Sequence, residues 1–379
     1  MKFTSINIKN MKSSCIKYLN QIIITISIIA LFTDCKTNKS IVEENRSLKD
    51  VNIYVTGYEY NDSKFEHSIE EMADEVGMRH VAKLWKNGKD INLESSERYS
   101  DANSVIVNNK DVYVVGYVAS DKENIAALWK NGKIQKLTDG KTFAHARSLF
   151  VENNNIYILG AQFNKTNYII KVWKNGIPKD VINGEKWVDA YSIFVDKGDV
   201  YICGDEKIMT NKYGAKIWKN GKPQNLTDEI NGSYALSLCV EKDIVYVVGY
   251  EYEKENNKYI AKLWINGKAQ NLSNGSNSSF AKAIYVYENK TYIVGSEIIN
   301  GVETVKLWIN GKAEYITNGK KNTYANSVFV HKNNIYIVGY EINDVDRTVA
   351  KLWINGIPKN LTDGTKNAYA NSIFIEEKK

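Results

Sequence analysis

The stretch AKLWINGK at residues 261–268 recurs, with small changes, seven times between Trp85 and Trp353. In each copy the tryptophan is followed, one residue later, by Asn-Gly. The spacings between successive tryptophans are 44, 44, 45, 46, 44 and 45 residues. A period of this length over most of a 379-residue chain is typical of an array of one supersecondary unit. The seven tryptophans are Trp85, Trp129, Trp173, Trp218, Trp264, Trp308 and Trp353.

The last repeat shows what one unit contains. It reads as four short runs, ANSVFV (325–330), NIYIVGYE (334–341), TVAKLWI (348–354) and KNLT (359–362), which we name strands a, b, c and d. The first three are rich in β-branched and aromatic residues and are too short for helices. The Asn-Gly pair between c and d predicts a type I′ turn, because both central residues of that turn need positive φ. Each unit is therefore expected to be an antiparallel sheet of four strands.

The three prolines of the chain indicate which strand lies outermost. Pro178, Pro223 and Pro358 all come two residues after the turn glycine, at the start of strand d. Proline cannot donate to a β-ladder and is confined to edges and strand starts, so strand d is expected at the outer edge and strand a innermost. Runs such as SVFV lack polar alternation, which indicates that both faces of each sheet are covered by neighbouring sheets.

The two ends of the array predict a closed ring. The first unit begins at Asn52 directly with strand b, and the chain ends with an extra strand a, AYANSIFIE at 368–376. This last strand would complete the first sheet and remove the open ends of an incomplete ring. The fold class is therefore expected to be all-β, a seven-bladed β-propeller over residues 51–379 with four antiparallel strands per blade.

The order SVFV, IYIVG and AKLW followed by a turn resembles the blade of WD-repeat propellers, in which a tryptophan ends strand c. No Gly-His precedes strand a and no Asp follows the Trp, so the hydrogen-bonded tetrad of that family is absent. One glycine ends each strand b where kelch repeats have two. The chain is also similar to bacterial secreted propellers built on an LWKNG repeat. These resemblances imply the fold and say little about activity.

The N-terminal residues differ in kind from the repeats. Lysines precede the apolar run IIITISIIALF (22–32), which is short for a membrane span and typical of a secretory signal. Cys35 stands where a bacterial lipoprotein signal has its lipid-acceptor cysteine, although Asp34 is unusual before it. We expect a signal peptide at 1–34, a tether at 35–50 and a membrane-anchored lipoprotein of the cell envelope. A plain signal peptide and an uncleaved anchor are the alternatives.

The net charge and the cysteines limit the kinds of partner and site that the sequence suggests. The net charge of +6 falls to about +3 without residues 1–34, which gives no electrostatic reason to expect a nucleic-acid partner. Cys203 and Cys239 lie in apolar runs of different repeats and are expected to be buried thiols, with a disulfide or a metal site as alternatives. No metal site and no cofactor is expected, and we expect a monomer.

The repeated tryptophans and the tyrosines of strand b are expected to be core. Burying one Trp removes about 150–250 Å² from water, worth roughly 4–6 kcal/mol.

Candidate ligand contacts lie at the end of the ring that carries the b–c and d–a loops. There, an aromatic residue enters every strand a, and blades 2 to 4 carry a polar residue directly before the small Ala. A polar arc facing an aromatic arc is typical of a sugar or peptide site, and sealing of the seams between blades is the alternative. The candidate ligand-binding residues are Tyr99, Asp101, Phe143, His145, Trp187, Asp189, Tyr234, Phe280, Tyr324 and Tyr369.

A second feature at this end is an insertion in the first blade. Residues 60–80 add about 14 residues between strands b and c, and SIEEMADE suggests a short acidic helix capped by Ser68. A loop of this length in a compact repeat is often functional, and a solvated excursion without a role is the alternative.

Two classes of function fit these features. A non-catalytic, extracytoplasmic module that binds a protein or glycan needs only a rigid ring with varied loops. A glycan-active hydrolase or lyase needs two carboxylates at a controlled separation, and Asp101 with Asp189 is the pair at this end that could serve. No nucleophile has a plausible base beside it, so no catalytic residue is assigned and we favour the binding module. A purely structural module docked in an envelope complex is not separated from it by sequence.

Overall fold

The computed structural model describes residues 50–61, 80–95, 99–119, 123–183, 186–210, 212–228 and 230–378. The chain divides into a unit from Ile53 to Glu376 and a second unit formed by residues 1–52 and 377–379. All regular elements among the described residues are strands, and none of these residues forms a helix that could cross a bilayer. The expected signal peptide, Cys35 and most of the insertion, with Ser68, lie outside the described residues.

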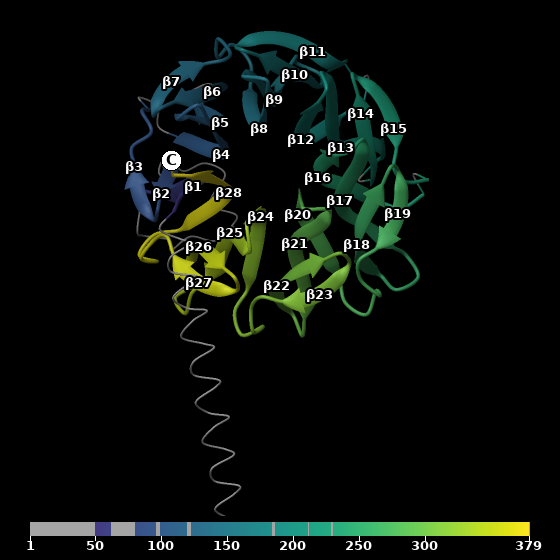
Figure 1. Ribbon diagram of the computed structural model, residues 1–379. Coiled ribbons are helices and arrows are strands. Elements are labelled where there is room, and N and C mark those ends of the chain that lie inside the picture. The colour runs from purple at the N-terminus through teal and green to yellow at the C-terminus, as the bar shows by residue number, and fades with distance from the viewer. Residues whose placement is uncertain are drawn as a thin grey trace, which may run out of the picture. The chain divides into compact units, whose positions relative to one another are not determined.

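Twenty-eight strands of the described chain form seven four-stranded sheets, each antiparallel, in a ring (Figure 1). Blade 1 is β28-β1-β2-β3, and blades 2 to 7 follow in chain order from β4-β5-β6-β7 to β24-β25-β26-β27. Strands a are β28 (Ala368–Glu377), β4 (Tyr99–Asn108), β8 (Ala144–Glu152), β12 (Val188–Asp196), β16 (Ser233–Glu241), β20 (Ser279–Tyr287) and β24 (Thr323–His331). Strands b are β1 (Val51–Tyr60), β5 (Asp111–Ala119), β9 (Asn155–Phe163), β13 (Asp199–Met209), β17 (Ile244–Glu253), β21 (Lys290–Ile299) and β25 (Asn334–Ile342).

The remaining strands lie progressively farther from the ring axis. Strands c are β2 (His80–Lys86), β6 (Asn124–Lys130), β10 (Tyr168–Lys174), β14 (Lys212–Lys219), β18 (Lys258–Ile265), β22 (Val302–Ile309) and β26 (Thr348–Ile354). Strands d are β3 (Lys89–Ile91), β7 (Lys133–Lys136), β11 (Ile177–Asn183), β15 (Lys222–Asn225), β19 (Lys268–Asn271), β23 (Lys312–Tyr315) and β27 (Ile357–Asn360). Each strand d is an outer edge, as the prolines predict.

The c–d hairpins confirm the predicted turns and correct the bounds of strand d. All seven Asn-Gly pairs have positive φ, from 47° to 54° at Asn and from 78° to 82° at Gly. Because a two-residue turn pairs the residues that flank it, strand d starts at Ile357 and not at Lys359, and Pro358 faces Trp353. Each turn asparagine also accepts a hydrogen bond from the start of strand b, as Asn355 Oδ1 does from the Ile335 N–H at 2.9 Å.

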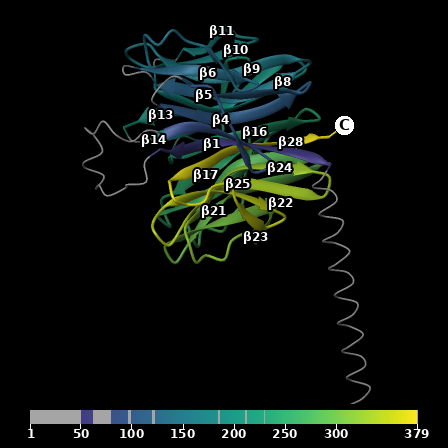
Figure 2. The same cartoon turned by 90° about the vertical axis from the view of Figure 1, so that its left-hand side faces the viewer.

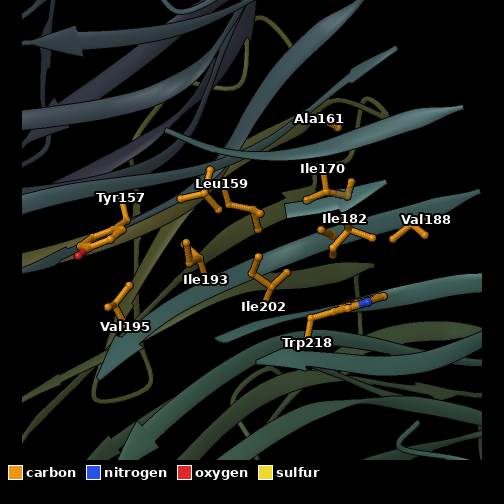
Figure 3. Packing of buried hydrophobic residues seen from close by; sticks show 12 residues of the cluster. Tyr157, Leu159, Ala161, Ile170, Ile182, Val188, Ile193, Val195, Ile202 and Trp218 are labelled. Carbon is orange, nitrogen blue, oxygen red and sulfur yellow. The ribbon is translucent and has the colours of Figure 1, made fainter. Parts of the chain in front are cut away.

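The seven tryptophans form the core of the seams between blades, with exposed fractions of 0–2%. Trp218 of blade 4, for example, belongs to one apolar cluster with Tyr157, Leu159 and Ile170 of blade 3 (Figure 3). Such burial rules out these indoles as ligand platforms. Cys203 is also buried and Cys239 is half-buried, and both are free thiols, so the disulfide alternative is wrong. Within the described residues no group of His, Cys, Asp and Glu side chains could hold a metal ion.

A β-bulge in strand a ties neighbouring blades together near the ring axis. In blades 2 to 7 the register of strands a and b shifts by one residue just after the small Ala, as between Ala325 and Ser327. The residue at this position is Asn103, Arg147, Tyr191, Leu236, Lys282 or Asn326 in blades 2 to 7, and Asn371 in blade 1. Four of these side chains donate to the carbonyl of the Ala in the next strand a: Asn103 to Ala146, Arg147 to Ala190, Asn326 to Ala370 and Asn371 to Ala102.

The last strand closes the ring as expected. Strand β28 pairs with β1 and completes blade 1, and it lies between β24 and β4 (Figures 1 and 2). On one side Asn326 donates to the Ala370 carbonyl at 2.9 Å, and on the other Asn371 donates to the Ala102 carbonyl at 3.2 Å.

Candidate functional site

The ten candidate residues lie at the end of the ring that carries the b–c and d–a loops, and all are half-buried. They do not form one equivalent set. Tyr324 faces Tyr340, the residue after the strand-b glycine, and Asp101 faces Tyr117 in the same way, whereas Tyr99 lies two residues farther out and faces Ala119. Tyr99, Phe143 and Trp187 are thus offset by two residues from the register position that Asp101, His145 and Asp189 occupy, as their spacing from the small Ala indicates.

Rings from strands b and c join the candidates into contacting groups. Tyr340 stacks on Tyr324 at 4.5 Å and meets the edge of Tyr369 at 4.7 Å, and Tyr369 stacks on Tyr58 at 4.7 Å. The group continues from Tyr58 to His80, and from His80 to Tyr99 of blade 2. It thus covers the two seams on either side of the closing blade.

Two further groups cover other seams. Tyr250 links Tyr234 and Phe280, with 4.9 Å between ring centroids in both contacts. Tyr168 contacts Trp187 at 4.8 Å, Phe143 at 6.0 Å and His145 at 6.1 Å. The linking residues Tyr340, Tyr58, Tyr250, Tyr168 and His80 were not among the candidates. Three of them directly follow the strand-b glycine, which is the sequence signal that marks this position.

The polar candidates are separated. Asp101 lies in the seam of blades 1 and 2, with its Oδ1 3.5 Å from His80 Nε2. Asp189 lies with Arg147 in the seam of blades 3 and 4, where Oδ1 is 3.9 Å from Nη1. Each therefore has a different partner and lies in a different seam. The carboxyl group beside Asp189 is that of Asp205, its cross-strand partner on β13.

Burial shifts the protonation of these groups. It raises the pKa of Asp101 to about 6, against the opposing hydrogen bond from Tyr117. It also raises the pKa of Asp205 to about 7, with the charge of Asp189 acting in the same direction. Burial, helped by the Arg147 charge, lowers the pKa of His145 to about 3 and keeps its imidazole neutral. The pKa of the Cys203 and Cys239 thiols is raised by burial, so neither is a ready thiolate.

The Asp205 shift predicts that stability falls as the pH rises. The folded-state pKa is about 7 and the ordinary value 3.8, so the folded chain holds a proton that the unfolded chain releases between these values. The contribution is fully present below about pH 4 and lost by about pH 7, a change on the order of 4 kcal/mol. We expect urea unfolding at pH 4.5, 6 and 8 to show this decline and Asp205→Asn to remove most of it.

The matched control is Glu255→Gln, which neutralises an exposed carboxyl in the turn between β17 and β18. It should keep the decline of the unmodified protein. If the stability of the Asp205→Asn protein fell with rising pH as much as that of the unmodified protein, the assignment of the buried proton to Asp205 would be contradicted.

The outer rim of the ring has grooves along several seams. One, between blades 4 and 5, is lined by residues of the hairpins and outer strands, among them Lys222, Gln224 and Gly267. Large apolar side chains stand exposed on this rim, including Ile177 and Ile357 at the starts of strands d. The rim offers exposed side chains for matched controls away from the candidate site.

Comparison with known proteins supports the scaffold. The sequence matches no protein family and no curated protein. Among solved structures it is similar to the β-propeller domain of the Trilobed protease from Pyrococcus furiosus, with a TM-score of 0.50 and 11% identity over 83% of this chain and 93% of that one. It is also similar to a puromycin-hydrolyzing peptidase from Mycobacterium tuberculosis, with a TM-score of 0.53 and 8% identity over 75% of this chain.

A TolB-like protein from Agrobacterium tumefaciens matches with a TM-score of 0.44 and 12% identity, over 63% of this chain and 93% of that one. The match to the peptidase covers 49% of the peptidase chain. At these identities the likeness to the Pyrococcus domain and to the peptidase shows the fold alone and nothing about chemistry. The chain is a seven-bladed β-propeller. The domain from Pyrococcus is described as having an open velcro topology, whereas strand β28 completes blade 1 of this propeller.

Proposed function

We propose that this propeller is a non-catalytic binding module, monomeric and exported to the cell envelope through its N-terminal signal and Cys35. Its ligand, a protein or a glycan, would bind at the end of the ring that carries the b–c and d–a loops. The observation that carries the proposal is the gathering there of half-buried rings in contacting groups beside one charged seam. Half-buried aromatic rings with a few polar groups are the usual composition of ligand sites.

The protonation of the site supports binding over catalysis. General acid–base work at neutral pH needs paired groups within reach of a substrate. The His145 imidazole is held neutral by burial, and Asp205 has an exposed fraction of only 1%. The groups open to a ligand, Arg147 and Asp189, offer one donor and one acceptor beside aromatic rings, which is recognition chemistry.

A binding screen of the purified chain tests the proposal. It combines a glycan array with capture of envelope proteins, and compares the unmodified chain with the triple variant Tyr324→Ala, Tyr369→Ala and Asp189→Ala. We expect the unmodified chain to bind a ligand and the triple variant to lose at least about tenfold in affinity, because truncation of a single tyrosine hot spot costs about 2 kcal/mol or more.

The control is a triple variant on the rim, Ile177→Ala, Ile357→Ala and Asp243→Ala, which also removes two large side chains and one carboxylate. It should bind as the unmodified chain does, and circular dichroism should show that both triple variants are folded at the temperature of the binding assay. Equal binding by the two triple variants would show that the ligand site lies elsewhere.

A further inference from the structure

The seam of blades 3 and 4 contains a group of charged and polar side chains close to the candidate residues Asp189 and Trp187. It consists of Arg147 on β8, Asp189 and Tyr191 on β12, and Asp205 on β13. Asp205 has an exposed fraction of 1%, and its Oδ1 has no hydrogen-bond partner. A buried carboxyl oxygen without a partner is costly, and such groups mark sites where a proton or a ligand completes the hydrogen bonding. We call these four residues the polar sector.

Contacts within the polar sector hold its side chains in fixed positions. The Arg147 guanidinium lies 4.7 Å from the centre of the Tyr191 ring, and Nη1 donates to the Ala190 carbonyl at 3.2 Å. The Tyr191 hydroxyl is hydrogen-bonded to Asp205. The Trp187 indole N–H donates to Asp189 Oδ2 at 3.2 Å. Preorganised side chains lose little freedom when a ligand binds, which favours affinity.

Two members of the sector are open to a ligand. The Asp189 and Arg147 side chains both have exposed fractions of 31%, and Asp189 Oδ1 is 3.9 Å from Arg147 Nη1, too far for a hydrogen bond. Both groups therefore keep hydrogen-bonding capacity for an incoming molecule. One is an acceptor and the other a donor, so a group that both donates and accepts satisfies the two together.

The charge balance of the sector favours a neutral ligand. Arg147 and Asp189 carry opposite charges, and the raised pKa of Asp205 keeps much of its carboxyl protonated below neutral pH. An anionic ligand would meet Asp189, and a cationic ligand would meet Arg147, so like charges oppose both. Hydroxyl groups have neither disadvantage.

Aromatic rings flank the sector on both sides. Trp187 meets the Tyr168 ring edge-on at 4.8 Å. On the other side, Tyr234 and Tyr250 lie close enough to Asp205 for its carboxylate, besides burial, to raise their pKa values. The C–H faces of a sugar ring are apolar and pack on such rings, while its hydroxyl groups point outward from the ring edge. A sugar therefore matches the combination of an aromatic wall with a donor and an acceptor.

We propose that the polar sector, with the neighbouring Trp187, binds adjacent hydroxyl groups of a neutral carbohydrate. Asp189 accepts from one hydroxyl, Arg147 donates to its neighbour, and Trp187 packs against the sugar ring. Asp205 is a positioning residue that fixes Tyr191, on which Arg147 stacks. This proposal names the ligand class for the proposed binding function and rests on it.

The test uses the full chain on an array of neutral, acidic and amine-bearing glycans, followed by calorimetry with the neutral oligosaccharides that bind. We expect binding confined to neutral glycans and a loss of at least tenfold for Asp189→Asn and for Arg147→Lys. The first substitution removes the charged acceptor, and the second removes the planar guanidinium that stacks on Tyr191 and holds the donor in place. Asp243→Asn, on the exposed rim, is the matched carboxylate control and should bind as the unmodified chain does.

A pH profile separates the positioning role of Asp205 from a merely structural one. The groups facing Asp205 are Asp189 and Tyr191 on β12, Arg147 on β8, Tyr234 on β16 and Tyr250 on β17, besides Cys203 on its own strand. The phenols and the thiol have raised pKa values, so they keep their protons between about pH 6 and 8. We expect affinity to fall severalfold over this range, and Asp205→Asn, which mimics the protonated carboxyl, to bind well with a flat profile.

Three results would overturn the inference. These are binding limited to acidic or amine-bearing glycans, binding of neutral glycans that Asp189→Asn and Arg147→Lys leave unchanged, and capture of an envelope protein at this end of the ring with no glycan bound. The last result would leave the proposed binding function standing and remove the carbohydrate. The absence of any ligand would contradict both.

Discussion

A chain that ends at Asn367 is expected to melt at least about 10 °C below the full chain, or not to fold. The deletion removes strand β28, which buries Ile373 and Ile375 with exposed fractions of 4% and 5%. Losing a buried isoleucine side chain costs about 2–5 kcal/mol, and a folded chain is stable by only roughly 5–15 kcal/mol. The hydrogen bonds that Asn326 and Asn371 make on the two sides of the strand are lost as well.

Thermal unfolding followed by circular dichroism checks this expectation. The control is a chain that ends at Lys378 and so keeps every residue of β28. Its melting temperature should equal that of the full chain. Equal melting temperatures for the chains ending at Asn367 and Lys378 would show that closure by the last strand contributes no stability to the ring.

The second large effect is expected from Gly339→Ala in strand β25. A Cβ at this position would lie 1.8 Å from the Tyr324 carbonyl oxygen and 2.9 Å from the Ala325 Cα. Both atoms belong to the backbone of strand β24, so the clash is relieved only by separating strands a and b next to the bulge. We expect a loss of at least about 3 kcal/mol in the free energy of unfolding, at the severe end of single substitutions.

Gly232→Ala is the matched control for this substitution. A Cβ on Gly232 would have nothing within 4 Å, and its φ is not in the left-handed region. Its stability should stay within about 1 kcal/mol of the unmodified chain. Urea denaturation of the three proteins makes the comparison. A Gly339→Ala protein as stable as Gly232→Ala would mean that strands a and b can separate at the bulge without cost.

The fold could be predicted from the sequence because its signals are local and repeated seven times. Asn-Gly dictates a two-residue hairpin wherever it occurs between strands, and the Trp and Pro positions fix the inner and outer sides of a blade. The extra run at 368–376 predicts closure for the same reason. The role of Gly339 was not predictable, since it lies within strand b and not at its end, and its close contact is with a strand some 15 residues earlier.

The bulge explains why the site was only partly predicted. Counted back from the a–b turn, where His331 pairs with Asn334, an unbroken register would place Tyr324 opposite Glu341. The register shift after Ala325 places it opposite Tyr340 instead. The same shift brings Asp189 opposite Asp205. The candidates on strand a were found from their positions, but their partners on strands b and c depend on this one-residue shift, which no run of the sequence displays.

The bulge residues also differ from blade to blade in the contacts that they make with the next blade. At four consecutive seams, from blade 7 round to blade 4, an Asn or Arg side chain donates a hydrogen bond to the Ala carbonyl of the next strand a. At the bulge position of blade 5 stands Leu236, whose side chain has no hydrogen-bond donor. Arg147 makes the last hydrogen bond of this series and is also the donor of the polar sector. A ligand that drew the Arg147 guanidinium away from the Ala190 carbonyl would break this hydrogen bond between blades 3 and 4, so occupancy of the proposed site and one contact between these blades would depend on the same side chain.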